Sequence, residues 1–313
     1  MVEPMLQVEN LAVGYAAEPV AVELNLRVDA GEMVSILGAS GVGKSSLLRA
    51  VAGFLTPHTG VIRVAGEDVA GWAPERRQVG MVFQSGALFG HMSVRDNVGF
   101  GLIGQANAAE TVAELLDNLG LAALAERLPA QLSGGQRQRV GIARAFAGNP
   151  AMVVADEPVS ALDVSVQAAV TELLMDIQRE HGTTLLFISH DLSVVRYLAD
   201  RIIVMYLGQI MESGTTDEIF SPPYHPYTEA LLSAIPIADP HVTKRHIVLE
   251  GALPSVLDPP KGCPFNTRCP KKLGDICERE MPPVQKPTEG HGIACHIPLE
   301  ELRKAEAVIK AAS

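Results

Sequence analysis

One stretch of the chain has the residue spacing of a phosphate-binding loop. After the apolar segment Met33–Leu37, glycines and small residues lead to Lys44 and Ser45 in the order Gly-x4-Gly-Lys-Ser. Glycines let successive backbone N–H groups turn toward one anion, and a helix that begins there adds partial positive charge. The lysine would reach the β- and γ-phosphates of a nucleotide, and the serine would bind Mg²⁺. The loop residues expected to bind the cofactor are Gly38, Ser40, Gly41, Val42, Gly43, Lys44, Ser45 and Ser46.

Two carboxylates follow a second apolar segment, Ala151–Ala155. Asp156 would hold Mg²⁺, directly or through water, and Glu157 would polarise an attacking water as general base. An acidic pair at a strand end is usually a solvated turn, so this assignment depends on the phosphate-binding loop. Lys44 is also the only lysine in the first 242 residues, which contain 13 arginines. This usage indicates that the position requires a compact ammonium rather than a planar guanidinium.

A second glycine-rich turn, Leu132-Ser133-Gly134-Gly135-Gln136, precedes a helical run. With this motif the chain resembles the ATP-binding subunits of ABC transporters, over about residues 5–240. The resemblance implies an ATP sandwiched between two subunits. Ser133, Gly134 and Gly135 of one subunit, in a motif that includes Gln136, would then cover the γ-phosphate held by Lys44 of the other.

The same resemblance implies roles for four further residues. Tyr15 would stack on adenine, and Asp163, in Ser-Ala-Leu-Asp, would act across the dimer. Gln84 would sense Mg²⁺ and the membrane partner, and His190 would contact the γ-phosphate. Gln84 and His190 therefore join Glu157 as the residues assigned to catalysis. The residues assigned to Mg²⁺ are Ser45, Gln84 and Asp156.

These motifs require an α/β fold that brings several strand ends together. The resemblance implies a P-loop NTPase of the ABC cassette type, with a RecA-like core, an antiparallel β subdomain near the start and a helical subdomain. We expect an ATPase domain over 1–240, a helical subdomain with the signature motif at about 85–145, and a small C-terminal extension over 241–313. The strands that carry the motifs are expected at 32–37, 79–83, 151–155 and 183–189.

The C-terminal extension contains all four cysteines of the chain. The run Pro-Tyr-His-Pro-Tyr-Thr at 223–228 precedes it and resembles the end of ATPases that energise peptide and nickel importers. Some members of that subfamily bind a [4Fe–4S] cluster in this region, which makes such a cluster a candidate cofactor. Zinc is weaker because the spacing has no Cys-x2-Cys, and unligated or disulfide-bonded thiols stay open. The cysteines are Cys263, Cys269, Cys277 and Cys295.

Charge and hydropathy limit the partners. Residues 1–242 hold 14 Lys and Arg against 27 Asp and Glu, which argues against nucleic acid. We expect an intracellular chain, because no apolar stretch reaches the ~18 residues of a membrane span and no secretory signal is apparent. The resemblance implies a second ATPase subunit, paralogous or identical, and two transmembrane permease subunits at the cytoplasmic face of the inner membrane. An extracytoplasmic binding protein would be an indirect partner.

The sequence gives two different indications of the transported solute. The resemblance of the C-terminal extension favours peptides, but the segment 84–94 departs from the usual peptide-importer pattern and looks more like ATPases of sugar, ion or polyamine importers. The alternatives are an importer ATPase for metal, sugar or polyamine, or a non-transport ABC ATPase acting on a soluble partner. We also expect 299–309 to form a short amphipathic helix.

Overall fold

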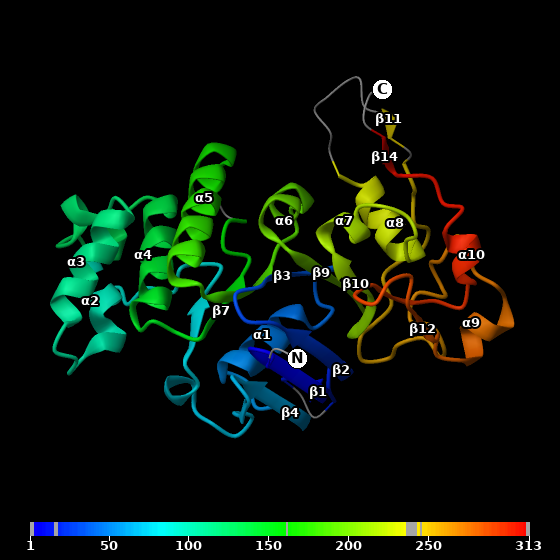
Figure 1. Cartoon of the computed structure of the whole chain (residues 1–313), viewed down its shortest axis with the longest axis horizontal. Coiled ribbons are helices and arrows are strands. Elements are labelled where there is room, and N and C mark those ends of the chain that lie inside the picture. The colour runs from blue at the N-terminus through cyan, green and yellow to red at the C-terminus, as the bar shows by residue number, and fades with distance from the viewer. Residues whose placement is uncertain (1–2, 16–17, 161, 236–242, 245, 311–313) are drawn as a thin grey trace.

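Three sheets form among the residues that the computed structural model describes, which are 3–15, 18–160, 162–235, 243–244 and 246–310 (Figure 1). Their strands are β1 (Leu6–Val13), β2 (Ala21–Val28), β3 (Met33–Leu37), β4 (Thr59–Val64), β5 (Glu67–Asp68), β6 (Val79–Val82), β7 (Met152–Asp156), β8 (Thr184–Ile188), β9 (Arg201–Tyr206), β10 (Gln209–Thr215), β11 (Thr243–Lys244), β12 (Val284–Gln285), β13 (Gly292–Ala294) and β14 (Ile309–Lys310). The eight-stranded sheet has the order β12-β13-β10-β9-β3-β8-β7-β6. The expected antiparallel sheet near the start is confirmed, with the order β2-β1-β4-β5, and β11 pairs with β14.

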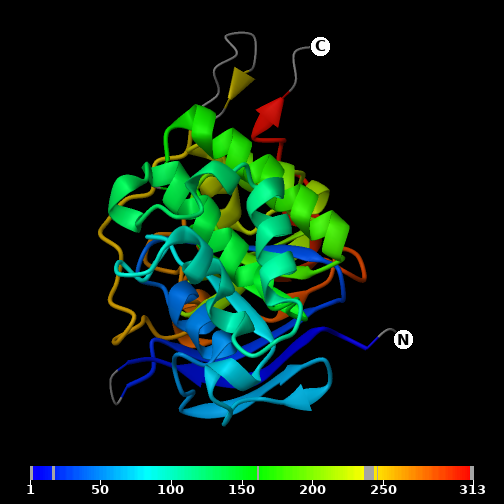
Figure 2. The ribbon, with the colours of Figure 1, turned by 90° about the vertical axis from the view of Figure 1, so that its left-hand side faces the viewer.

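Helices cover both faces of the large sheet and form one end of the molecule (Figure 2). The α-helices are α1 (Lys44–Ala52), α2 (Val94–Gly99), α3 (Ala108–Asn118), α4 (Gly134–Ala147), α5 (Val164–His181), α6 (Leu192–Leu198), α7 (Thr216–Ile219), α8 (Pro226–Ser233), α9 (Asp275–Arg279) and α10 (Leu299–Leu302). Single 3₁₀ turns lie at Pro74–Arg76, Phe100–Leu102, Ala122–Leu124 and Pro129–Gln131. The helices α2 and α3 lie at the opposite end from α9 and α10.

The centre of the large sheet is parallel. Strands β9, β3, β8, β7 and β6 are neighbours that run in one direction. Every residue of β3, β7 and β8 is buried, as the continuous apolar runs of a parallel sheet covered on both faces require. In the register, Ile36 and Asp156 both pair with Ile188, so the carboxyl ends of these strands share one edge.

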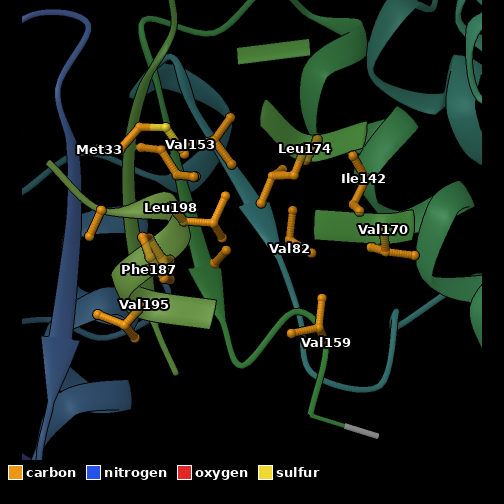
Figure 3. Packing of buried hydrophobic residues seen from close by; sticks show 14 of the residues in the cluster. Met33, Val82, Ile142, Val153, Val159, Val170, Leu174, Phe187, Val195 and Leu198 are labelled. Atoms are coloured by element: carbon orange, nitrogen blue, oxygen red, sulfur yellow. The ribbon is translucent and has the colours of Figure 1, made fainter. Parts of the chain in front are cut away.

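Side chains alternate between two cores across this sheet. Val34 and Ile36 point to the core shared with α1 and the antiparallel sheet, whereas Met33 points to the other core. Figure 3 shows that second core, in which the sheet residues Val153 and Phe187 lie beside side chains of the covering helices. These helix residues are Ile142 from α4, Val170 and Leu174 from α5, and Val195 and Leu198 from α6.

The C-terminal extension contributes two strands, β12 and β13, to the large sheet. Strand β13 pairs antiparallel with β10, with Glu212 opposite Ile293, and β12 pairs with β13. Glu212 is almost fully buried. Its Oε1 lies 2.8 Å from Nε2 of His291, and its Oε2 accepts a hydrogen bond from the backbone N–H of His225 at 2.9 Å. The extension is therefore joined to the cassette by backbone pairing and by a buried polar network.

The expected amphipathic helix over 299–309 is wrong beyond its first turn. Helix α10 ends at Leu302, and β14 begins at Ile309. The physical reason is that the apolar residues enter different clusters. Leu302 packs with Ile293 and Cys295, whereas Val308 packs with Tyr224 and its neighbours, so one helix could not bury both.

The buried ring of His225 predicts an acid-sensitive fold. Burial lowers its pKa from 6.5 to about 3, so the native state keeps the ring neutral while the unfolded chain protonates it below pH 6.5. This group therefore reduces the free energy of unfolding as the pH falls from about 6.5 toward 3, by up to about 1.4 kcal/mol per pH unit. His225→Asn should show a shallower decrease of Tm between pH 6.5 and 5 than the wild-type protein. The exposed His181→Asn is the control, and an unchanged slope for His225→Asn would contradict this account.

Candidate active site

The phosphate-binding loop joins the end of β3 to the start of α1. Gly38 has a φ of 148°, and a Cβ there would lie 2.2 Å from the carbonyl oxygen of Met205, so this position requires glycine. The ammonium of Lys44 donates to the carbonyl oxygens of Gly38 at 2.9 Å and Ala39 at 2.7 Å. Burial lowers the pKa of Lys44, while the carboxylates that end β7 oppose this shift. The lysine is thus held inside its own loop.

A pocket of about 300 Å³ lies over this loop. Its lining residues are Tyr15, Val20, Ser40, Gly41, Gly43, Lys44, Ser45, Ser46 and Glu157. Of the predicted loop residues, Gly38 and Val42 do not line it, and Val42 is fully buried. Sequence reasoning missed Val20, an apolar residue just before β2 that no spacing pattern marks.

The predicted catalytic residues meet at the shared edge of the sheet. The hydroxyl of Ser45 donates to Oδ1 of Asp156 at 2.9 Å, which connects the loop to the end of β7. Gln84 donates through Nε2 to Oε2 of Glu157 at 3.0 Å, and Nδ1 of His190 lies 3.4 Å from the same oxygen. Glu157 has a left-handed φ of 49°, and its backbone N–H donates to the carbonyl oxygen of Ile188 at 3.1 Å.

Tyr15 lines the pocket and is 62% exposed. Its hydroxyl accepts a hydrogen bond from Arg49, whose guanidinium carbon lies 5.8 Å from the ring centroid. An exposed aromatic ring beside a phosphate-binding loop can stack on a base.

The signature motif forms a helix N-terminus away from this pocket. Ser133 caps α4 by accepting the N–H of Gln136 at 3.3 Å, and the Gln136 side chain accepts the N–H of Ser133 at 2.8 Å. A Cβ on Gly135 would lie 2.4 Å from Cγ1 of Val166, so the turn packs tightly on α5. Asp163 caps α5, and hydrogen bonds from Ser165 and the Val166 backbone lower its pKa. Within the described part of the chain, none of Ser133, Gly134, Gly135, Gln136 or Asp163 lines the pocket that contains Lys44.

The four cysteines are all described and none forms a disulfide. Three are buried and Cys269 is half-buried. Burial, with a contribution from neighbouring thiols, raises the pKa of Cys263 to about 11 and of Cys295 to about 12. Among the residues that the structure describes, no group of three or more His, Cys, Asp or Glu side chains is arranged to hold a metal ion. The arrangement therefore gives no support to the expected iron–sulfur site.

One residue near the loop was not predicted at all. Tyr227, on α8, accepts the backbone N–H of Ala39 at 3.1 Å. The sequence reasoning used its Pro-Tyr-His-Pro-Tyr-Thr run only as a mark of resemblance. Burial raises the pKa of Tyr227 to about 12, so its hydroxyl stays protonated at neutral pH.

A phosphate-binding loop, a Ser–Asp pair and a glutamate at the carboxyl edge of a parallel sheet define an ATPase of the P-loop class. Comparison with family models refines this class. Residues 22–160 match the family described as ABC transporter, and residues 211–277 match the one described as oligopeptide/dipeptide transporter, C-terminal region.

Individual proteins agree with the family models. A probable peptide ABC transporter ATP-binding protein of Sinorhizobium fredii is 42% identical, over 95% of this chain and 91% of that protein. The oligopeptide transport ATP-binding protein AppF of Bacillus subtilis is 43% identical, over 85% and 86%. A solved dimeric structure of the ATP-binding cassette MJ0796, bound to ADP and Pi after hydrolysis, covers 68% of this chain and 99% of its own, with 30% identity and a TM-score of 0.62.

The chain therefore belongs to the ATP-binding proteins of ABC transporters, and it is an ATPase with the cassette fold that the sequence predicts. In the described ranges, no helix has the length and apolar character needed to cross a membrane.

Proposed function

We propose that the chain binds MgATP and hydrolyses it to power peptide import through membrane partners. The observation that carries the catalytic part is the convergence of Gln84 and His190 on one carboxylate oxygen of Glu157. That carboxylate lines the same pocket as Lys44 and the Ser45 hydroxyl. A carboxylate fixed from two sides beside a phosphate site suits a general base for an attacking water.

Each residue then has a chemical role. Lys44 exchanges the two loop carbonyls for the β- and γ-phosphates when ATP enters. Ser45, Asp156 and Gln84 would hold Mg²⁺, and the ion would neutralise charge on the phosphates when bound. Glu157 takes a proton from the attacking water, while the side-chain amide of Gln84 and the ring of His190 orient its carboxylate.

We further propose that two subunits, identical or paralogous, assemble head to tail around the nucleotide. The support is that Ser133, Gly134, Gly135, Gln136 and Asp163 stand at two capped helix N-termini outside their own subunit's pocket. Such termini favour negative charge, and a partner's bound ATP would supply it. The cassette MJ0796, which has the same fold, was solved as a dimer.

The helical end of the molecule offers a surface for the permease. A pocket of about 570 Å³ lies between α2 and α3, and its rim includes Phe100, 43% exposed, and Ile103, 80% exposed. We infer that this pocket receives a helix of one permease subunit, and that the second ATPase subunit receives a helix of the other, which holds the ATPases at the cytoplasmic face of the membrane. The extracytoplasmic binding protein then acts on this chain only through the permease.

A charge at this rim should uncouple the chain from the permease. Ile103→Asp places a carboxylate in the apolar contact, so we expect loss of copurification with the permease and of substrate-stimulated ATPase activity. Basal ATPase activity of the isolated chain should stay unchanged, because Ile103 does not line the pocket that contains Lys44. Val248→Asp, at a site 72% exposed, is the matched control. Normal permease binding by Ile103→Asp would refute this docking site.

The proposal that the transported solute is a peptide rests on the relatives, whose names specify peptide or oligopeptide transport. The test is the complete transporter, reconstituted with its permease and binding protein in vesicles. Di- or oligopeptides should stimulate ATP hydrolysis, whereas sugars and polyamines should not. Stimulation by a sugar or polyamine alone would favour the solute class suggested by the segment 84–94.

For the four cysteines we propose a bound metal, with a [4Fe–4S] cluster ahead of zinc. The support is chemical, because neighbouring thiols contribute to the raised pKa values of Cys263 and Cys295 and thiolates bind either metal. Loading would require the thiols to rearrange, because in the described part of the chain no three of them are placed to hold a metal ion. Anaerobic purification followed by iron, sulfide and zinc analysis tests the proposal. We expect about four irons and four sulfides per chain, and a metal-free protein would refute it.

A further inference from the structure

The peptide group that joins Gly38 to Ala39 is held at both of its ends. Its carbonyl oxygen accepts a hydrogen bond from Lys44 at 2.9 Å, and its N–H donates to the hydroxyl of Tyr227 at 3.1 Å. Tyr227 lies 188 positions further along the chain and is only 2% exposed. A residue of α8 therefore helps to fix the backbone on which the catalytic lysine rests.

Aromatic packing fixes Tyr227 in turn. We call Tyr206, Tyr227 and Phe265 the aromatic cluster. The ring of Tyr227 lies edge-on to that of Tyr206, with centroids 4.7 Å apart, and 5.3 Å from that of Phe265. Phe265 is fully buried and follows Cys263 by two positions, so it belongs to the C-terminal extension. The cluster thus connects the phosphate-binding loop to the extension through three adjacent rings.

We propose that Tyr227 is a positioning residue for the phosphate-binding loop, held in place by the C-terminal extension through Phe265. Its hydroxyl sets the plane of the Gly38–Ala39 peptide and so the resting place of the Lys44 ammonium. A loop that is ordered before ATP arrives loses less entropy on binding. This inference rests on the proposed ATP site and adds a role for residues outside the cassette motifs.

The proposal predicts a separation between nucleotide affinity and chemistry. Without the hydroxyl, the N–H of Ala39 loses its acceptor and the loop samples more conformations. Nucleotide binding should weaken, whereas kcat should change little, because Glu157, Gln84 and His190 follow other strands and do not contact Tyr227 in the described structure. A general loss of fold would instead lower both values and the amount of active protein.

The chain offers a closely matched control for this test. Tyr227→Phe removes only the hydroxyl and keeps the ring. Tyr224→Phe makes the same change at a buried tyrosine of the same motif, whose hydroxyl donates to the carbonyl of Phe220 at 3.2 Å and not to the loop. We expect Tyr227→Phe to weaken MgADP binding about 3- to 10-fold in calorimetric titration, as loss of one hydrogen bond implies, and Tyr224→Phe to leave it unchanged.

Hydrogen exchange gives a second readout, independent of activity. Amides of the loop peptide should exchange faster in Tyr227→Phe than in the wild-type protein, and Tyr224→Phe should match wild type there. The part played by the extension is tested with Phe265→Leu. If Phe265 acts through Tyr227, then Phe265→Leu weakens MgADP binding by itself but adds little to Tyr227→Phe.

Two results would overturn the proposal. Equal MgADP affinity and equal loop exchange in Tyr227→Phe and Tyr224→Phe would remove the role of Tyr227. Fully additive effects of Tyr227→Phe and Phe265→Leu would remove the coupling to the extension. Lys44→Ala tests the ATP site itself. If Lys44→Ala left MgADP binding unchanged, the proposed ATP site would be refuted, rather than only the positioning role of Tyr227.

Discussion

Glu157→Gln should lower ATP turnover about 10²- to 10⁴-fold, the usual cost of losing a general base. MgATP binding should stay close to that of the wild-type protein, because the glutamine keeps the size of the side chain. Its amide oxygen can still accept the hydrogen bond that Gln84 donates to Oε2, but it cannot take a proton from water. The variant should also accumulate as an ATP-bound dimer, because the sandwich forms and is not cleared by hydrolysis.

Phosphate release under saturating MgATP measures the turnover, and gel filtration with and without ATP measures the dimer. Glu172→Gln is the matched control, since Glu172 is an exposed glutamate of α5 away from the pocket. Near-normal turnover in Glu157→Gln would show that another group activates the water.

Lys44→Arg should lower kcat/KM about 10²- to 10³-fold even though the positive charge is kept, in line with the loss of one preorganised donor to developing charge. Lys44 is 7% exposed, and its ammonium donates to two loop carbonyls at 2.7 and 2.9 Å. A guanidinium is larger and planar, so it cannot occupy the same point within the loop. The absence of other lysines from the first 242 residues agrees with this requirement.

Initial rates across a range of MgATP concentrations measure this effect. Lys261→Arg makes the same substitution at an exposed lysine of the extension and should leave the rates unchanged. If Lys44→Arg retained wild-type kcat/KM, a positive charge alone would be sufficient at this position, and a compact ammonium would not be required.

The catalytic arrangement was predictable because each motif follows a parallel strand. Gln84, Glu157 and His190 lie far apart in the sequence, after β6, β7 and β8. Buried parallel strands give continuous apolar runs that a sequence displays, and their carboxyl ends lie along one edge. The contacts among these three side chains follow from that topology, although the distances do not.

The contacts of the C-terminal extension were not predictable in this way. Strands β12 and β13 have two and three residues, which is too short for an alternating pattern to be recognised. The Tyr227–Ala39 hydrogen bond joins distant segments and has no local signal. The helix expected over 299–309 failed for a related reason, because spacing alone does not reveal that Leu302 and Val308 enter separate clusters.

The pairing of β13 with β10 has a consequence for how the chain can be divided. A protein cut after residue 240 would leave β10 as an open edge strand, with unpaired backbone groups available to other chains. It would also leave the buried carboxylate of Glu212 without His291. The extension therefore acts as a cover for the sheet edge, and the smallest piece that can stay monomeric in solution is longer than the cassette motifs suggest.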